Sequence, residues 1–380
     1  MRFPEFSGEW ELVRLGDVCK FFSGGTPSST NKNFYGGDIP FIRSGEIHSS
    51  STELYISEAG LNSSSAKIIE QGDLLLALYG ATSGDIAISK IKGAINQAIL
   101  CIRTNHDNFF LKSCWEKHCR KLLQTYLQGG QGNLSADIVK SIKMSFPSCL
   151  EQKKISGLLA LIEERIETQK KIIEKYESLI RGLITSVNKG EICKCKATAL
   201  KDVLTEVHEK NVENHEVCSV SVSQGVINQI DYLGRSFAAK EVLHYNVVNY
   251  GDIVYTKSPT GEFPYGIVKR SNLDRPVAVS PLYGVYRPVN DYVGIYLHLY
   301  FKSPVNTKNY LQRLIQKGAK NTINITNQHF LDNQILIPEH GWLEIIVNAA
   351  STIEKMIQIE CDALLWLERQ KNYLLSKMFI

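Results

Sequence analysis

The sequence lacks the features that mark membrane, secreted and zinc-binding proteins. Its 380 residues contain no apolar run of the roughly 18 residues that a membrane span needs, and no apolar signal segment follows Met1. The nine cysteines are odd in number and scattered, without the spacing of a disulfide framework or of a zinc motif. We therefore expect a cytoplasmic chain with reduced thiols, no metal site and no membrane partner.

A strong charge of either sign is also missing. The formal net charge is +4, which is low for a chain that binds nucleic acid through electrostatics alone. The 43% of hydrophobic and 22% of charged residues are typical of a globular protein, and the length allows two or three domains. Composition alone therefore leaves the function open.

Signatures of common active sites are absent as well. The sequence has no phosphate-binding Gly-x-x-x-x-Gly-Lys-Ser/Thr loop, no Gly-x-Gly-x-x-Gly after a strand and no Gly-x-Ser-x-Gly nucleophile elbow. The nearest approach to the Asn/Asp-Pro-Pro-Tyr tetrad of amino-methyltransferases is Ser258-Pro259-Thr260-Gly261, which lacks the second proline and the aromatic residue. We therefore predict no catalytic residue and no cofactor.

The most regular feature is an apolar stripe between Cys149 and Asn188. Stripe positions recur every fourth and then every third residue, and Gln169 is the single polar member. This heptad period predicts a helix, about 57 Å long, that pairs with another helix. The stripe consists of Ile155, Leu159, Ile162, Ile166, Gln169, Ile173, Tyr176, Ile180, Leu183 and Val187.

A second stripe with the same spacing ends the chain. Most of its members are again apolar or small, and Glu360 stands at the position that corresponds to Gln169. Either stripe alone would fit an amphipathic helix on a core, but two copies in register predict a coiled coil. The second stripe consists of Ile346, Ala350, Ile353, Ile357, Glu360, Leu364, Leu367, Lys371, Leu374 and Met378.

The stretches before the two stripes repeat short motifs in the same order. Leu200-Lys201-Asp202-Val203 echoes Leu15-Gly16-Asp17-Val18, and Gly251-Asp252-Ile253 echoes Gly72-Asp73-Leu74. A basic helix predicted at 108–128 has a predicted counterpart at 308–317, whereas the loops between the motifs differ.

The repeat predicts a fold class and a chain direction. A parallel helix pair would require the second half to carry the chain back along the whole helix, so short connections favour an antiparallel pair. We therefore predict an α+β protein in which two globular mixed α/β domains are separated by a long antiparallel two-helix coiled coil, with a pseudo-two-fold internal repeat. The predicted parts are globular domains at 1–149 and 191–339 and helices at 150–190 and 340–380.

The ordered motifs resemble the specificity subunits of type I restriction–modification systems. In that family each half is a target-recognition domain that reads one block of a split DNA sequence, and the helices hold the halves apart. The resemblance implies a non-catalytic subunit for DNA modification and phage defence. Its implied partners are double-stranded DNA, two modification (methyltransferase) subunits, and restriction subunits with nuclease and motor activity. The matching segments are Trp10 to Val18, Ser23 to Pro27, Ile39 to Ile42, Tyr79 to Gly84, Ala94 to Ala98, and Pro147 with Glu151 to Ile155.

Two segments of the second half depart from the family pattern. Trp342-Leu343 stand where Glu151-Gln152 stand in the first half. The loop 257–265 does not match the Tyr79 to Gly84 pattern.

Side chains suited to DNA contact lie on predicted loops. Lys and Arg bind phosphates and guanine, while Asn, Gln, Ser and Thr bind other base edges. Each candidate could equally be a solvated surface residue. In the first half they are Ser28, Thr30, Asn31, Lys32, Arg43, Tyr79, Thr82, Gln131 and Asn133. In the second half they are Gln224, Arg235, Lys240, Tyr255, Lys257, Ser258, Tyr265, Lys320, Asn321 and Asn324.

Two alternatives remain open from the residues alone. One is a DNA methyltransferase or endonuclease with an unrecognised site, which methyl transfer by the isolated chain would support. The other is a coiled-coil scaffold with protein-binding heads. Strong salt dependence of DNA binding would separate a DNA-specificity subunit from such a scaffold.

Overall fold

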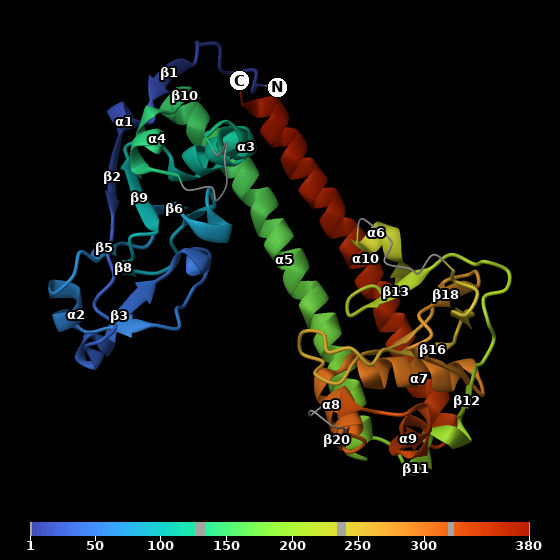
Figure 1. Cartoon of the computed structure of the whole chain (residues 1–380). Coiled ribbons are helices and arrows are strands. Elements are labelled where there is room, and N and C mark those ends of the chain that lie inside the picture. The colour runs from blue at the N-terminus through green and yellow to red at the C-terminus, as the bar shows by residue number, and fades with distance from the viewer. Residues whose placement is uncertain (1, 127–133, 234–240, 318–322, 380) are drawn as a thin grey trace. The chain divides into compact units, whose positions relative to one another are not determined.

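The computed structural model describes residues 2–126, 134–233, 241–317 and 323–379 (Figure 1). The chain forms two compact units, each of which contains part of both long helices. Unit 1 comprises residues 1–170 and 362–380, and unit 2 comprises residues 171–361. Within the described ranges, no helix is both long and apolar enough to cross a membrane.

Unit 1 is built around a four-stranded antiparallel sheet. The run Leu74–Ala77 is buried on both sides, and its alternate side chains enter two different cores. Leu74 and Leu76 pack with helix α3 (Asn108–Tyr126), whereas Leu75 and Ala77 pack with residues of a second sheet. In spatial order the strands are β2 (Cys19–Ser23), β9 (Ile99–Thr104), β6 (Leu74–Ala77) and β7 (Ile86–Ile88).

The second sheet of unit 1 forms a separate lobe. Its strands, in spatial order, are β4 (Tyr55–Ile56), β3 (Tyr35–Ile42), β8 (Gly93–Ile95) and β5 (Lys67–Ile69), of which β3 and β8 are parallel. Short helical turns border this lobe and the sheet edge: η1 (Lys32–Phe34), η2 (Ser44–Glu46), α2 (Glu58–Asn62) and η3 (Gly80–Thr82). The remaining elements of the unit are β1 (Glu11–Arg14), α1 (Leu15–Val18), α4 (Ala136–Ser141) and β10 (Lys143–Phe146).

Unit 2 repeats both the lobe, in which a single parallel bridge joins Val217 to Ala278, and the central sheet. Its strands follow the same spatial order, namely β12 (Leu204–Glu206), β19 (Gly284–Pro288), β16 (Ile253–Tyr255) and β17 (Val268–Arg270). Four two-stranded pairs surround that sheet: β11 (Cys195–Ala199) with β22 (Gln334–Pro338), β13 (Cys218–Ser221) with β14 (Gly225–Asn228), β15 (Asn246–Val248) with β18 (Val277–Val279), and β20 (Gln316–Lys317) with β21 (Ile323–Asn324). The helices are η4 (Leu200–Asp202), α6 (Gln229–Leu233), α7 (Asp291–Lys302), α8 (Pro304–Gln312) and α9 (Asn327–Asp332).

The internal repeat extends to individual side chains. Asp73 receives two hydrogen bonds from Arg103, at 2.9 and 2.5 Å, and Asp252 receives two from Arg287, at 3.0 and 3.1 Å. Each aspartate follows a glycine with positive φ and precedes the central strand, while each arginine lies on the neighbouring strand. The predicted internal repeat is therefore confirmed in its sheet order and in the contacts that join its strands.

The two long helices run in opposite directions. In unit 1, Ile155 near the start of α5 (Cys149–Asn188) shares a core with Met378 at the end of α10 (His340–Met378). In unit 2, Ile184 near the end of α5 shares a core with Ile346 near the start of α10. The predicted antiparallel pairing is confirmed, because each unit joins the beginning of one helix to the end of the other.

The Glu151-Gln152 pair anchors the start of α5. Gln152 is fully buried; its amide donates to the carbonyl of Pro147 at 2.8 Å, and its oxygen accepts from the Asp107 N–H at 3.1 Å. Glu151 is 1% exposed and binds Arg2 through two contacts of 2.7 Å. At the start of α10 the position that corresponds to Gln152 is occupied by an apolar residue, Leu343, which is buried in the unit 2 core.

The predicted helix at 308–317 is wrong in its limits. The helix α8 begins at Pro304, where the Ser303 side chain accepts from the Asn306 N–H, and it ends at Gln312. Gln316–Lys317 is a strand instead, because its backbone pairs with Ile323–Asn324. Helix α7, which covers β17, was not predicted.

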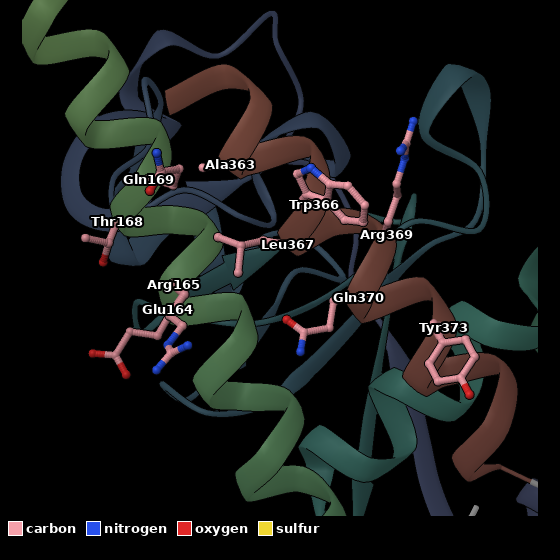
Figure 2. Close-up of a pocket in the computed structure, with 10 residues that line it drawn as sticks. All are labelled: Glu164, Arg165, Thr168, Gln169, Ala363, Trp366, Leu367, Arg369, Gln370 and Tyr373. Atoms are coloured by element: carbon pink, nitrogen blue, oxygen red, sulfur yellow. The ribbon is translucent and has the colours of Figure 1, made fainter. Parts of the chain in front are cut away.

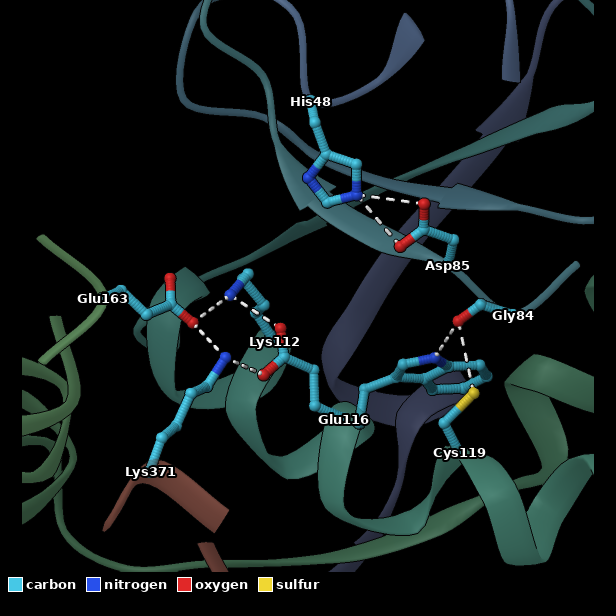
Figure 3. A network of polar contacts seen from close by, with 9 residues as sticks. His48, Gly84, Asp85, Lys112, Glu116, Cys119, Glu163 and Lys371 are labelled. Carbon is cyan, nitrogen blue, oxygen red and sulfur yellow. Dashed lines mark hydrogen bonds and ion pairs between the residues drawn. The ribbon is translucent and has the colours of Figure 1, made fainter. Parts of the chain in front are cut away.

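An ion-pair network ties α3 to both long helices within unit 1 (Figure 3). Its members are Lys112 and Glu116 of α3, Glu163 of α5 and Lys371 of α10. Both ammonium groups lie 2.6 Å from Glu163 Oε1. Burial raises the pKa of Glu163, but the two lysines outweigh burial and hold that pKa below its ordinary value.

We expect Glu163→Gln to destabilise unit 1 by about 2–4 kcal/mol, because it leaves two partly buried ammonium groups with a single carboxylate. Thermal unfolding followed by circular dichroism measures the change. The matched control is Glu167→Gln on the same helix, whose partner Lys90 lies 3.6 Å away and 49% exposed. A surface pair of this kind contributes about 0–1 kcal/mol. Equal shifts in the two variants would contradict a stabilising role for the network.

Candidate nucleic-acid interface

Four of the DNA-contact candidates in unit 1 lie together on an exposed loop before β3. The hydroxyls of Ser28 and Thr30 are 2.8 Å apart, and the Asn31 side chain accepts from the Asn33 N–H at 3.1 Å. Asn31 thereby caps the helical turn that carries Lys32, which is exposed. The loop thus has a defined backbone and presents polar side chains to solvent.

The Arg43 side chain is hydrogen-bonded to two carboxylates of the same loop and is not free to contact DNA in this arrangement. Its guanidinium makes two bonds to Glu46, at 3.0 and 2.9 Å, and one to Glu53 at 2.6 Å. The hydrogen bond from Arg43 lowers the pKa of Glu46 to about 2. Glu46 also accepts from the Thr52 hydroxyl, so these contacts close the 43–53 segment into a compact loop. The structure therefore gives Arg43 a local structural role.

Tyr79 and Thr82 lie on the turn η3, at the end of the central strand β6. The Tyr79 side chain is 40% exposed. Behind it, the Ser83 hydroxyl donates to the Leu78 carbonyl at 3.0 Å, and the indole N–H of Trp115 donates to the Gly84 carbonyl at 2.8 Å. These bonds attach the turn to the sheet and to α3.

The described candidates of unit 2 divide into buried and exposed groups. Tyr255 is only 1% exposed and stacks on Phe330 at 4.9 Å, while its hydroxyl donates to the Tyr265 carbonyl. Its side chain therefore belongs to the core and not to a DNA-facing surface. Lys257 and Ser258 are exposed, as is Gln224 at the turn between β13 and β14.

Several candidates lie outside the described residues. These are Gln131, Asn133, Arg235, Lys240, Lys320 and Asn321. Asn324 is part of β21, and only its backbone is described.

Sequence reasoning missed a basic cavity in unit 2. A cavity of about 230 Å³ lies between the turn 222–226, strand β17 and helix α7. Its charged and polar lining includes Lys269, Arg270, His298 and Lys302, and Gln224 stands beside them. The available signal was Lys269-Arg270 at the end of a strand, where a buried strand is usually apolar throughout.

A family model for the "Type I restriction modification DNA specificity domain" matches residues 7–178. The matched range contains the central sheet and second sheet of unit 1 and most of α5.

Curated proteins similar to part of this chain come from archaea and bacteria. The chain is 29% identical over 182 residues to the type I restriction enzyme MjaIX specificity subunit of Methanocaldococcus jannaschii, covering 45% of this chain and 42% of that protein. It is 27% identical over 196 residues to the HindI specificity subunit of Haemophilus influenzae, covering 48% and 42%. The matched segment thus spans less than half the length of each relative.

The likeness in fold extends beyond residues 7–178. A crystal structure of a type I restriction–modification system S subunit from M. genitalium superposes with a TM-score of 0.60 at 10% identity, covering 100% of this chain and 99% of that one. The whole chain therefore has the fold of an S subunit.

The Arg43–Glu46 contact predicts a pH-dependent stability of unit 1. The pKa of Glu46 falls from 4.5 to about 2 on folding, so its ionised form stabilises the folded state above about pH 4.5. This contribution is lost as the pH falls from about 4.5 toward 2. We expect the difference in unfolding free energy between the native chain and Glu46→Gln to shrink through that window, as measured by urea unfolding at successive pH values. Glu9→Gln, at an exposed position, is the control. A difference that does not vary with pH would contradict the assignment.

Proposed function

We propose that this chain is the DNA-sequence-specificity subunit of a type I restriction–modification complex and that it is itself non-catalytic. The observation that carries the proposal is one central sheet in two copies, each with the same Asp–Arg contact but with lobes that differ in strand length and in their connecting loops. A common scaffold with different attachments suits two readers of different DNA sequences. The family match of residues 7–178 supports this proposal.

In this proposal each half reads one block of a bipartite, gapped DNA target. The recognition domains are residues 1–149 and 191–339. Unit 1 offers the lobe around β3 and the loop 28–32, whereas unit 2 offers the hairpin β13–β14 and the strand pair β15–β18. These elements differ in strand length and in their connecting loops, so the side chains that they direct at DNA would read unrelated base sequences.

The long helices are proposed as the spacer and as the docking site of the modification subunits. Restriction subunits would join the same complex, which would act in the cytoplasm where DNA is accessible. Support for docking comes from a groove of about 890 Å³ between α5 and α10 in unit 1 (Figure 2). Trp366 and Tyr373 line it and remain 68% and 53% exposed. Large exposed aromatic side chains in a concave surface are characteristic of protein–protein interfaces.

A domain exchange tests the proposed readout. The full chain is assembled with its modification subunits, supplied with S-adenosylmethionine and DNA, and the methylated sites are mapped. Replacing residues 1–149 with the corresponding half of a relative should change one block of the target and preserve the other block and the gap. Replacing residues 191–339 should give the reciprocal result. Simultaneous changes in both blocks would contradict independent readers, and methylation by the chain without modification subunits would contradict a non-catalytic role.

The groove in unit 1 predicts where a modification subunit binds. We expect the double variant Trp366→Ala/Tyr373→Ala to weaken binding to the modification subunit about 10- to 100-fold, the loss typical of aromatic interface residues. Isothermal titration calorimetry of the purified subunits measures the dissociation constant. Leu12→Ala is the matched control, because Leu12 is an exposed apolar residue of unit 1 outside the groove. Unchanged affinity in the double variant would exclude this groove from the interface.

A further inference from the structure

The basic cavity of unit 2, defined by Gln224, Lys269, Arg270, His298 and Lys302, has a one-sided charge distribution. Three of these five residues are cationic at neutral pH. The complete lining contains neither aspartate nor glutamate. Two carboxylates lie nearby, but each already has a cation: Asp291 contacts Arg270 at 2.7 Å, and Glu354 contacts Lys302 at 3.3 Å.

Lys269 is the one cation of the basic cavity for which the described residues provide no carboxylate partner. Its side chain is 4% exposed, and among the described residues its ammonium group makes no hydrogen bond or ion pair. Burial and, second to it, the charge of Lys302 together lower the pKa of Lys269 to about 8. An ammonium group buried in this way costs free energy unless an anion or several acceptors surround it. No described carboxylate supplies that compensation, and the ammonium lines a cavity that an external anion could enter.

His298 adds a directed donor to the same cavity. The backbone N–H of Arg270 donates to His298 Nδ1 at 3.3 Å. Burial, followed by the charges of Lys269, Lys302 and Arg270, lowers the pKa of His298 to about 3. The imidazole is therefore neutral near pH 7, and with Nδ1 accepting, its proton lies on Nε2. The cavity thus combines an ammonium group, an imidazole N–H and a second ammonium group at its edge.

We propose that the basic cavity binds a phosphate group of the DNA backbone, with Lys269 as its principal ligand. This inference rests on the proposed DNA-specificity function and deepens it. A phosphate supplies the anionic partner that Lys269 lacks. Its several acceptor oxygens can accept hydrogen bonds from Lys269, His298 and Lys302 together. A volume of about 230 Å³ accommodates one such group but not a folded partner.

The position of Gln224 favours a DNA phosphate over other phosphates. Gln224 is exposed on the β13–β14 turn, at the border of the basic cavity and in the lobe of unit 2, whose strands differ in length from those of unit 1. Phosphate contacts hold a reader in register, and neighbouring Asn or Gln side chains contact base edges. A phosphate held by Lys269 would therefore position the turn that carries Gln224 against the adjoining bases.

The first arm of the test uses inorganic phosphate and the full chain without DNA. At constant ionic strength, replacing chloride with phosphate should raise the unfolding temperature of the native chain more than that of Lys269→Gln, which keeps only the general stabilising effect of phosphate. In chloride alone, Lys269→Gln should be at least as stable as the native chain, since it removes an uncompensated buried charge. This stability also verifies that the variant folds. Lys196→Gln, at an exposed lysine of β11 outside the cavity, should respond to phosphate like the native chain.

The second arm measures DNA binding by the complex with modification subunits across a range of salt concentrations. We expect Lys269→Gln to reduce the slope of log Kobs against log salt by about 0.9, the value for one lost phosphate contact. Target and non-target DNA should weaken by similar factors, so that the ratio between them is retained. Lys196→Gln should leave the slope unchanged.

The outcomes separate this inference from the proposed function. Phosphate stabilisation without a change in the DNA slope would assign the cavity to a free phosphate-bearing ligand and overturn the DNA assignment. The absence of both effects would overturn an anion site altogether. Sequence discrimination by the native complex tests the proposed function independently, because it requires no change at Lys269. A native complex that did not distinguish target from non-target DNA would overturn both proposals.

Discussion

Burial of two apolar helix stripes is the interaction on which the rest of this structure depends. Neither α5 nor α10 could remain exposed along its stripe, and the burial of each isoleucine or leucine contributes about 1.5–3 kcal/mol. Ile155 and Met378 meet in one core, and Ile184 and Ile346 meet in the other. Each compact unit therefore contains pieces from distant parts of the sequence, and neither core is complete until both helices have contributed.

Polar contacts then fix the positions of the helices relative to the sheet within unit 1. Gln152 and Glu151 fasten the start of α5 to unit 1, and the network around Glu163 joins α3 to α5 and α10. These groups are buried or half-buried, so their hydrogen bonds and ion pairs specify one arrangement more sharply than apolar contact does. At the start of α10 an apolar residue, Leu343, takes the buried position instead. The two halves thus repeat the same arrangement of elements but differ in individual contacts.

Duplication of the sheet and divergence of its surroundings give the proposed function its physical basis. The Asp–Arg pairs at Asp73 and Asp252 join the same two strands in both units. The loops and lobe strands are free to differ because they lie outside these contacts. In unit 2 this freedom places a buried, uncompensated lysine beside an exposed turn, an arrangement that stability alone does not favour.

Periodicity, repetition and the rule of short connections determined the long helices, their antiparallel direction and the duplicated scaffold from the sequence alone. These features depend on local spacing and on comparison of two segments, both of which a sequence displays directly. The tertiary structure alone decided the roles of single side chains. Tyr255 is a core residue and Arg43 is held by two carboxylates, although tyrosine and arginine are both residue types that often contact DNA. Lys269 became a candidate ligand only through its burial among β17, α7 and the β13–β14 turn. Burial and partners depend on residues far away in the chain, so no local pattern could have specified them.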